Sequence, residues 1–301
     1  MKEKLIDFLK GIIIGIANIL PGFSGGVMAV AFNVYDRLIH AISNILSKPI
    51  KVIKDIWALG AGVAVGILIA IVGISLLLTN FPIPTIFFFT GLIVGSIPNI
   101  YEKTKDLKFN YKKVISFFIG FGFIIGLLLF SIFYNGTGSS VVVGEVDVKQ
   151  LAILFFVGII ASATMIIPGV SGSLVLLAIG YYQYIIDFIM NFLKAALAFD
   201  FSTMFSNALL VGALGLGIVV GILVLAKVIE KLIDKYPTIF YTIVFGLLVA
   251  SPFAIIYQLY IEYKEAIHSA LILNWLFGII FLVVGVITSH YISKSEQKQN
   301  L

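Results

Sequence analysis

Long stretches of the chain contain no Asp, Glu, Lys or Arg. Each stretch has room for one or two helices of about 20 residues, the length that crosses the hydrocarbon core of a bilayer. Five of them are residues 56–101, 114–144, 150–186, 201–226 and 236–261. Only 12% of the 301 residues are charged, whereas a soluble domain carries about 25%. Because the chain cannot cover its surface with polar groups, we expect an all-α integral membrane protein.

The chain repeats itself at an offset of 147 residues. Residues 11–39 align without a gap to residues 158–186, and the sequence Pro-Gly-x-Ser-Gly occupies the same place in both. Weaker similarity follows in the same order. It links residues 84–98 with 237–252 and residues 117–129 with 275–287. We therefore predict two copies of one unit, residues 1–135 and 148–301, with a linker at 136–147.

The lysines predict how the chain is threaded. Nearly all lie in five short clusters, and the positive-inside rule places these clusters and both termini in the cytoplasm. Each half then needs one hairpin that re-enters the membrane on its own side, followed by three crossings. The hairpins are residues 11–45 and 150–190, and the crossings are residues 57–79, 84–101 and 114–134, then 208–226, 237–258 and 272–292. Three crossings per half place the linker outside and invert the second copy, as in many secondary transporters.

The basic residues bear on two further questions. A net charge of +5 would suit a nucleic-acid partner, but the lysines mark cytoplasmic loops and need none. The N-terminal segment, residues 2–10, is either an amphipathic helix on the membrane surface or the first turns of the helix that follows. The sequence leaves both possibilities open, and it sets no oligomeric state.

The Pro-Gly-x-Ser-Gly motif predicts a helix that is broken inside the membrane. Proline removes a backbone donor, and glycine permits turns that are closed to other residues. Such a break is tolerated in lipid only where protein or water covers it. The apolar arms before the motifs, residues 12–20 and 159–167, reach about 14 Å each, half of a core of about 30 Å. We expect both motifs near the midplane, one entering from each side.

After each break a new helix begins, with Ser24 or Ser171 as its N-cap. The unpaired N–H groups and the positive dipole at a helix start favour an anion, most often phosphate. The candidate phosphate-binding residues are Pro21, Gly22, Ser24, Gly25 and Gly26 in the first motif and Pro168, Gly169, Ser171, Gly172 and Ser173 in the second. The alternative is that each motif is only a kink whose small residues let helices pack closely.

Arg37 is the only arginine in the chain. It lies 13 residues past Ser24, about 20 Å along a straight helix, and therefore near the cytoplasmic mouth. Its guanidinium could hold a phosphate that is being taken up or released, or it could simply snorkel to the membrane surface. Asp36 and His40 beside it are candidates for proton coupling. Three scattered histidines and no cysteine predict no metal site, and we expect no cofactor.

At these residues the chain resembles the polyprenyl-phosphate transporter family. The first motif region reads GIANILPGFSGGVMAVAFNVYDRLI and the second TMIIPGVSGSLVLLAIGYY, and the resemblance spans essentially the whole chain. It implies a flippase that returns undecaprenyl phosphate, the lipid carrier of cell-wall synthesis, from the outer to the inner leaflet by alternating access. The second copy has Ser173 in place of Gly26 and Tyr184 in place of Arg37, which predicts an asymmetric site.

Two other functions stay open at this point. Two such helix starts that face each other at the midplane would form a small polar chamber, and a channel or transporter for another small anion would use the same chamber. A membrane phosphatase of polyprenyl pyrophosphate would need an arginine beside the motif serine and a pair of glutamates four residues apart. The chain has Gly25 and Gly172 beside the serines, and its acidic pair Glu262 and Glu265 lies three residues apart in a predicted outer loop. We therefore expect no catalytic residues.

Overall fold

The structure is a computed structural model. It describes residues 2–19, 23–70, 73, 75–105, 110–133, 147–170, 172, 175–176 and 179–297. The regular elements in these ranges are helices, as predicted, and no strand occurs among them. In chain order they are α1 (Lys2–Ile19), α2 (Gly25–Ala31), α3 (Tyr35–Asn44), α4 (Pro49–Ile69), α5 (Ser75–Asn80), α6 (Pro82–Glu102), α7 (Tyr111–Phe133), α8 (Val148–Ile166), α10 (Tyr182–Leu197), α11 (Phe201–Lys235), α12 (Pro237–Glu262), α13 (Lys264–His268) and α14 (Ile272–Gln297).

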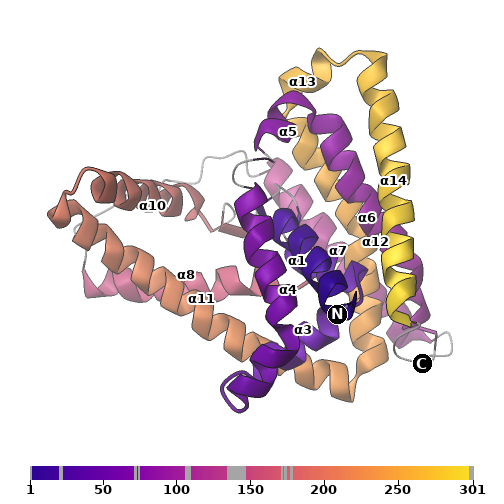
Figure 1. The fold of residues 1–301 in the computed structure, drawn as a ribbon, viewed down its shortest axis with the longest axis horizontal. Helices are drawn as coiled ribbons and strands as arrows, with labels where there is room; N and C mark the ends of the chain where they lie inside the picture. Colours follow the sequence, from indigo (N-terminus) through magenta and orange to yellow (C-terminus); the bar gives the residue numbers. More distant parts are fainter. Residues whose placement is uncertain are drawn as a thin grey trace.

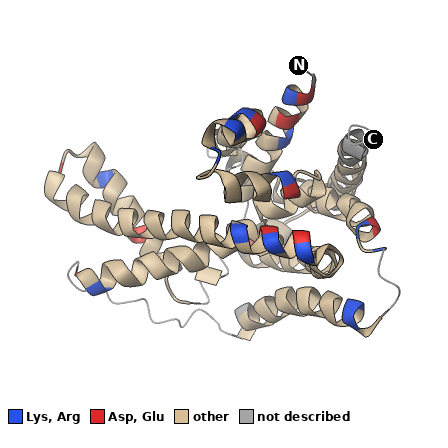
Figure 2. Ribbon diagram, turned by 90° about the horizontal axis from the view of Figure 1, so that it is seen from below, with Lys and Arg blue, Asp and Glu red and all other residues tan. Residues whose placement is uncertain are grey.

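Seven of the described helices are long and apolar enough to cross a membrane. They are α4, α6, α7, α8, α11, α12 and α14. Figure 2 shows long stretches of helix without charge, with the charged residues gathered near helix ends. This protein is therefore a multi-pass membrane protein. Six of the seven helices overlap the segments expected to cross, whereas α8 lies in a segment expected to form half of a hairpin.

The helices pack in four close pairs. Within each half, α1 packs along α4, and α8 packs along α11. The other two pairs join the halves, because α6 packs along α14 and α7 along α12. In Figure 1, α8, α10 and the first part of α11 project as an arm from the body that holds the remaining pairs.

Glycines set how closely these pairs approach. A Cβ on Gly62 of α4 would overlap the carbonyl oxygen of Phe8 in α1, and a Cβ on Gly217 of α11 would overlap the carbonyl oxygen of Phe155 in α8. Phe8 and Phe155 occupy the same position in the sequence repeat. Glycines also allow close contact in the pairs that join the halves, since Gly91 lies against Leu282 and Gly246 against Phe117. Such small residues allow the close helix contacts on which membrane proteins depend.

A second feature also recurs in both halves. Asn33 follows α2 and Gly180 precedes α10, and both have a positive φ, 57° and 78°. The next residue in each case donates its N–H to a carbonyl five residues back: Val34 to Ala29 at 2.9 Å and Tyr181 to Leu176 at 3.0 Å. This is the left-handed end that commonly terminates a helix, and it needs glycine or asparagine. It turns the chain into α3 in one half and into α10 in the other.

The helices before the motifs are longer than the nine-residue arms that we expected. Helix α1 runs for 18 residues from Lys2, and α8 runs for 19 from Val148. Residues 2–10 are therefore the first turns of α1 and not a separate surface helix. Charged residues are tolerated there because they find partners. The Nζ of Lys4 lies 2.8 Å from the carbonyl oxygen of Asp55, and the Nζ of the buried Lys10 lies 3.4 Å from that of Phe32.

Two other boundaries differ from the prediction. Helix α4 ends at Ile69 and the short α5 follows it, whereas we expected one crossing over residues 57–79. Helix α11 has 35 residues, far more than the segment 208–226. Its charged C-terminal turns continue the helix past the apolar part, and the side chain of Asp200 caps its start by accepting from the N–H of Thr203.

Candidate functional site

The two Pro-Gly-x-Ser-Gly motifs meet in the structure. Gly26, at the start of α2, lies against the segment that follows α8. A Cβ on Gly26 would be 3.4 Å from the Cα of Pro168 and 3.4 Å from the carbonyl oxygens of Met165 and Ile166. The sequence analysis expected the two motifs to face each other, and Gly26 and Pro168 are the residues that do so.

Ser24 is the residue before α2, as expected for an N-cap, with an extended backbone (φ −134°, ψ 131°). Its hydroxyl makes no capping hydrogen bond. It donates instead to the carbonyl oxygen of Thr164 in α8, at 3.4 Å. The serine of the first motif therefore bonds directly to the helix that leads into the second motif. Ser24 is buried, with 6% of its surface exposed.

The first N–H of α2 also has a partner within the protein. The N–H of Gly25 donates to the Oδ1 of Asn18 at 3.3 Å, and the side-chain amide of Asn18 donates to the carbonyl oxygen of Ile14 at 3.0 Å. We expected the donors of Ser24 and Gly25 to be available for an anion, but in this conformation both are engaged. Asn18 was missed by the sequence analysis, although an amide in an apolar run just before the motif was the available signal.

Helix α8 carries two buried hydroxyls, one beside this contact at Thr164 and one against Gly221 of α11 at Ser162. Those of Ser162 and Thr164 donate to carbonyls of their own helix, at 2.6 Å and 2.7 Å. Each hydroxyl oxygen can still accept a hydrogen bond. Gly172 lies beside Thr164, since a Cβ on this glycine would be 2.9 Å from the threonine Oγ1. The junction is thus buried and polar, and the residues named in it carry no charge.

The second motif packs against α12. Gly169 has a φ of 86°, a left-handed conformation that strains other residues. A Cβ on it would lie 2.9 Å from the Oγ of Ser251 and 3.4 Å from Leu247. Glycine is therefore required here both by the backbone and by the neighbouring helix. Of the other predicted motif residues, Pro21, Gly22, Ser171 and Ser173 lie outside the described part of the chain.

Helix α3 carries the other candidate residues and attaches to three neighbours through charged groups. Arg37 pairs with Asp7 of α1 at 2.8 Å. Asp36 pairs with Lys103, just after α6, at 3.1 Å, and it accepts a hydrogen bond from the phenol of Tyr241 in α12. The partner of Arg37 therefore lies in α1 and, among the described residues, not in either motif.

His40 connects α3 to the C-terminal part of α11. Its Nδ1 lies 2.7 Å from Glu230, and its Nε2 lies 3.7 Å from Asp234. The amide of Asn44, one turn later, donates to the same Glu230 carboxylate at 2.9 Å. The sequence analysis singled out Asp36, Arg37 and His40 but none of their partners, since nothing in a sequence identifies the far end of an ion pair.

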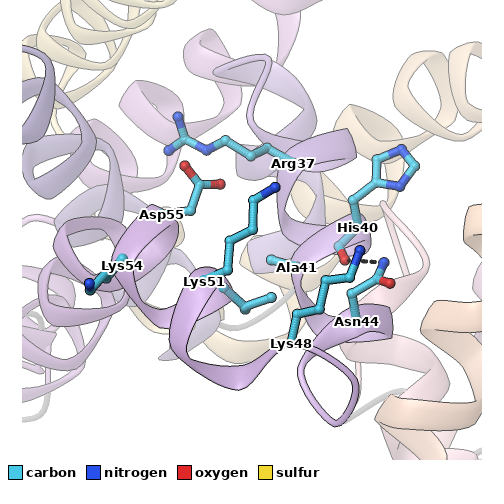
Figure 3. A pocket seen from close by; sticks show the side chains of 9 residues that line it. Arg37, His40, Ala41, Asn44, Lys48, Lys51, Lys54 and Asp55 are labelled. Atoms are coloured by element: carbon cyan, nitrogen blue, oxygen red, sulfur yellow. Dashed lines mark hydrogen bonds between the residues drawn. The ribbon is translucent and has the colours of Figure 1, made fainter.

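A cavity of about 640 Å³ opens between α3 and the start of α4. Figure 3 shows the side chains that line it. They are those of Arg37, His40, Ala41, Asn44, Lys48, Lys51, Val52, Lys54 and Asp55. Arg37 thus takes part in two features, the ion pair with Asp7 and the wall of this cavity.

Comparison with known proteins places this architecture in a family. The model of the undecaprenyl phosphate translocase-like family matches residues 14–204 and 189–300. The chain is 27% identical to a polyprenyl-phosphate transporter of Staphylococcus aureus over 297 residues, which cover 95% of both chains. It is 27% identical over 231 residues to a polyprenyl-phosphate transporter of Vibrio cholerae, covering 72% of this chain and 68% of that one.

No solved structure gives a significant match. The resemblance predicted from the two motifs is confirmed by the family model, which covers both motifs and nearly all of the chain. This protein belongs to the undecaprenyl phosphate translocase-like family.

Proposed function

We propose that this protein moves a polyprenyl phosphate, such as undecaprenyl phosphate, from the outer to the inner leaflet of the cell membrane. The observation that carries the proposal is the meeting of the two motifs, Gly26 against Pro168, in a buried and polar junction. The names of the two relatives support the substrate class, since both are polyprenyl-phosphate transporters. The protein performs no chemistry on the lipid.

The proposed mechanism is alternating access around this junction. With the motifs together, the hydroxyl of Ser24 and the N–H of Gly25 are bonded to Thr164 and Asn18. When the motifs separate, the contact between Ser24 and Thr164 breaks. The Ser24 hydroxyl and the Thr164 carbonyl oxygen then lack a hydrogen-bond partner. A phosphate oxygen accepts from such donors, so the head group takes the place of the contact between the motifs.

The proposed topology is an inverted duplication with both termini in the cytoplasm. It is supported by the tight glycine contacts, which recur at repeat-related positions such as those of Phe8 and Phe155. The left-handed turns at Asn33 and Gly180 agree with the same offset. In this arrangement each half contributes one re-entrant hairpin, and α8 is the long first arm of the second hairpin.

Proton coupling is proposed for Asp36 and His40. Both side chains join α3 to other helices, Asp36 through Lys103 and His40 through Glu230. A proton on either side chain weakens or changes one of these contacts, which links protonation to the position of α3. Transport that ignores an imposed pH gradient would rule this coupling out.

The test is flipping of undecaprenyl phosphate in liposomes that hold the purified protein. The wild type is compared with a Ser24→Ala, Ser171→Ala double variant. The matched control is a Ser206→Ala, Ser269→Ala double variant, because these exposed hydroxyls bond only within or next to their own helices. We expect fast flipping by the wild type and the control, and loss of flipping in the motif variant.

The other outcomes identify the alternatives. Flipping that survives the motif change would move the phosphate site away from these hydroxyls. A folded wild type that flips no lipid but takes up a soluble anion would favour the small-anion transporter. Release of phosphate from polyprenyl pyrophosphate would favour the phosphatase.

A further inference from the structure

The cavity between α3 and the start of α4 has an unusual balance of charge. Four of its lining residues carry a positive charge, Arg37, Lys48, Lys51 and Lys54, and one, Asp55, carries a negative charge. Within the described part of the chain, no carboxylate lies within ion-pair distance of any of the three lysine amines. Arg37 is paired with Asp7, but the three lysines outnumber Asp55, so the walls of the cavity have an excess of positive charge.

The three lysines form a row along one side of α4. Lys48 immediately precedes α4, and Lys51 and Lys54 follow at intervals of three residues, so each lysine neighbours the next on the helix surface. Figure 3 shows the amine of Lys51 directed toward Arg37 and Asp55, and the amine of Lys48 beside the amide of Asn44. Donors from two helices thus converge on one space.

The position of this row on its helix is unfavourable without an anion. Helix α4 begins at Pro49, with Lys48 as the preceding residue and no acidic residue in the first turn. The start of a helix carries a partial positive charge, which disfavours cations and favours anions. The positive-inside rule accounts for lysines on this side of the membrane, but it does not account for their gathering on one wall of a cavity opposite Arg37.

Arg37 has an unused donor at the same place. Its Nη2 pairs with Asp7. Its Nε–H is buried and has no hydrogen-bond partner among the described residues. A buried donor without a partner is costly. The guanidinium also brings a positive charge to the wall of the cavity.

We propose that this cavity is a second anion site, separate from the junction of the motifs, and that it binds a phosphate monoester group. Lys48 and Lys51 neutralise the dianion from the start of α4, Lys54 adds to the field, and the guanidinium of Arg37 adds positive charge from α3. A cavity of about 640 Å³ lies within the range of about 300–1,000 Å³ typical of sites for small ligands. The phosphate group belongs either to the head of a prenyl lipid at the cytoplasmic surface or to a soluble phosphate.

The experiment measures binding to the full-length protein in lipid nanodiscs by calorimetry. The probes are inorganic phosphate and farnesyl phosphate, with farnesol as the uncharged control. The test variant carries Lys48→Gln, Lys51→Gln and Lys54→Gln. The matched control carries Lys227→Gln, Lys231→Gln and Lys235→Gln, which removes the same charge from exposed turns of α11 outside the cavity.

We expect the test variant to bind phosphate about tenfold more weakly or worse, since it loses the charge-assisted hydrogen bonds of three lysines. The control should change binding by less than about twofold, because these lysines do not line the cavity and salt screens exposed charges. If the test variant binds both probes more weakly, the cavity is a phosphate site that does not distinguish a lipid head group from a soluble phosphate. A loss for farnesyl phosphate alone assigns the site to the lipid head group, and a loss for inorganic phosphate alone assigns it to a soluble phosphate.

Equal losses in the test and control variants, or no loss in the test variant, would overturn the proposal. These results are independent of the flipping assay. If phosphate binding depends on the three lysines but the protein flips no lipid, this site is supported and the proposed function is ruled out. If the protein flips lipid but its phosphate binding does not depend on the three lysines, the proposed function stands and the second anion site is ruled out.

Discussion

The phenol of Tyr35 donates a hydrogen bond of 2.9 Å to the carbonyl oxygen of Ile166. Tyr35 is the first residue of α3 and Ile166 the last of α8, so this single bond joins α3 to the end of the helix that leads into the second motif. The last carbonyls of a helix have no partner within the helix. Tyr35 provides one for a carbonyl that is 131 residues away in sequence.

Tyr35→Phe should lower the free energy of unfolding by about 1–3 kcal/mol, because it leaves a buried carbonyl without a donor. Thermal unfolding of the protein in detergent measures this change. Tyr291→Phe is the control, since 70% of Tyr291 is exposed, and it should leave the unfolding temperature unchanged. Equal stability of the two variants would mean that water already satisfies the Ile166 carbonyl.

The close approach of α8 and α11 can be tested on one helix. Gly217→Ala places a methyl group against the carbonyl of Phe155 and should cost about 1–3 kcal/mol of stability. Gly212→Ala on the same helix meets open space and should raise stability by up to about 1 kcal/mol, since alanine is the better helix former. A Gly217→Ala variant as stable as the Gly212→Ala variant would show that the two helices can separate at no cost.

Gly169→Ala should destabilise the protein for two separable reasons, a positive φ and a contact with the Ser251 hydroxyl. Adding Ser251→Ala removes only the contact, so the double variant should recover part of the lost stability. The backbone strain of about 1–2 kcal/mol should remain. Gly122→Ala on α7, which meets open space, is the control. Full recovery in the double variant would contradict the left-handed conformation at Gly169.

The ion pair between Asp7 and Arg37 should contribute modestly to stability. The carboxylate is 9% exposed but the arginine side chain is 35% exposed, so solvent screens the pair. A double-mutant cycle with Asp7→Asn and Arg37→Gln should give a coupling energy of about 1 kcal/mol or less. A coupling energy several times larger would show that Arg37 is more deeply buried in the membrane-embedded protein.

The proposed topology can be tested by labelling, because the chain contains no cysteine. A membrane-impermeant maleimide added to intact cells should label a Ser269→Cys variant, which carries its thiol between α13 and α14. A Ser47→Cys variant, altered just before the basic start of α4, should be labelled only after the cells are opened. The opposite pattern would reverse the orientation of the whole chain.

The sequence predicted the helical class and the family because both depend on patterns that are local or periodic. Charge-free runs mark membrane helices, and the paired motifs carry the resemblance. It left open whether residues 2–10 form a separate surface helix or the first turns of α1, because the charged side chains of this segment fit both. Their partners, such as Asp55 for Lys4, are supplied by another helix. The engagement of Gly25 by Asn18 likewise depends on how the chain folds back after the motif.

The pairing of α6 with α14 and of α7 with α12 has a consequence for biosynthesis. Helices α6 and α7 belong to the first half, but their partners α14 and α12 lie in the second half, and α14 begins only at Ile272. While the ribosome is still making the second half, the glycine face of α6 has only lipid or insertion machinery to contact. A chain that stops before α14 would leave that face uncovered for good. Quality-control proteases of the membrane should therefore detect late truncations of this protein as readily as early ones.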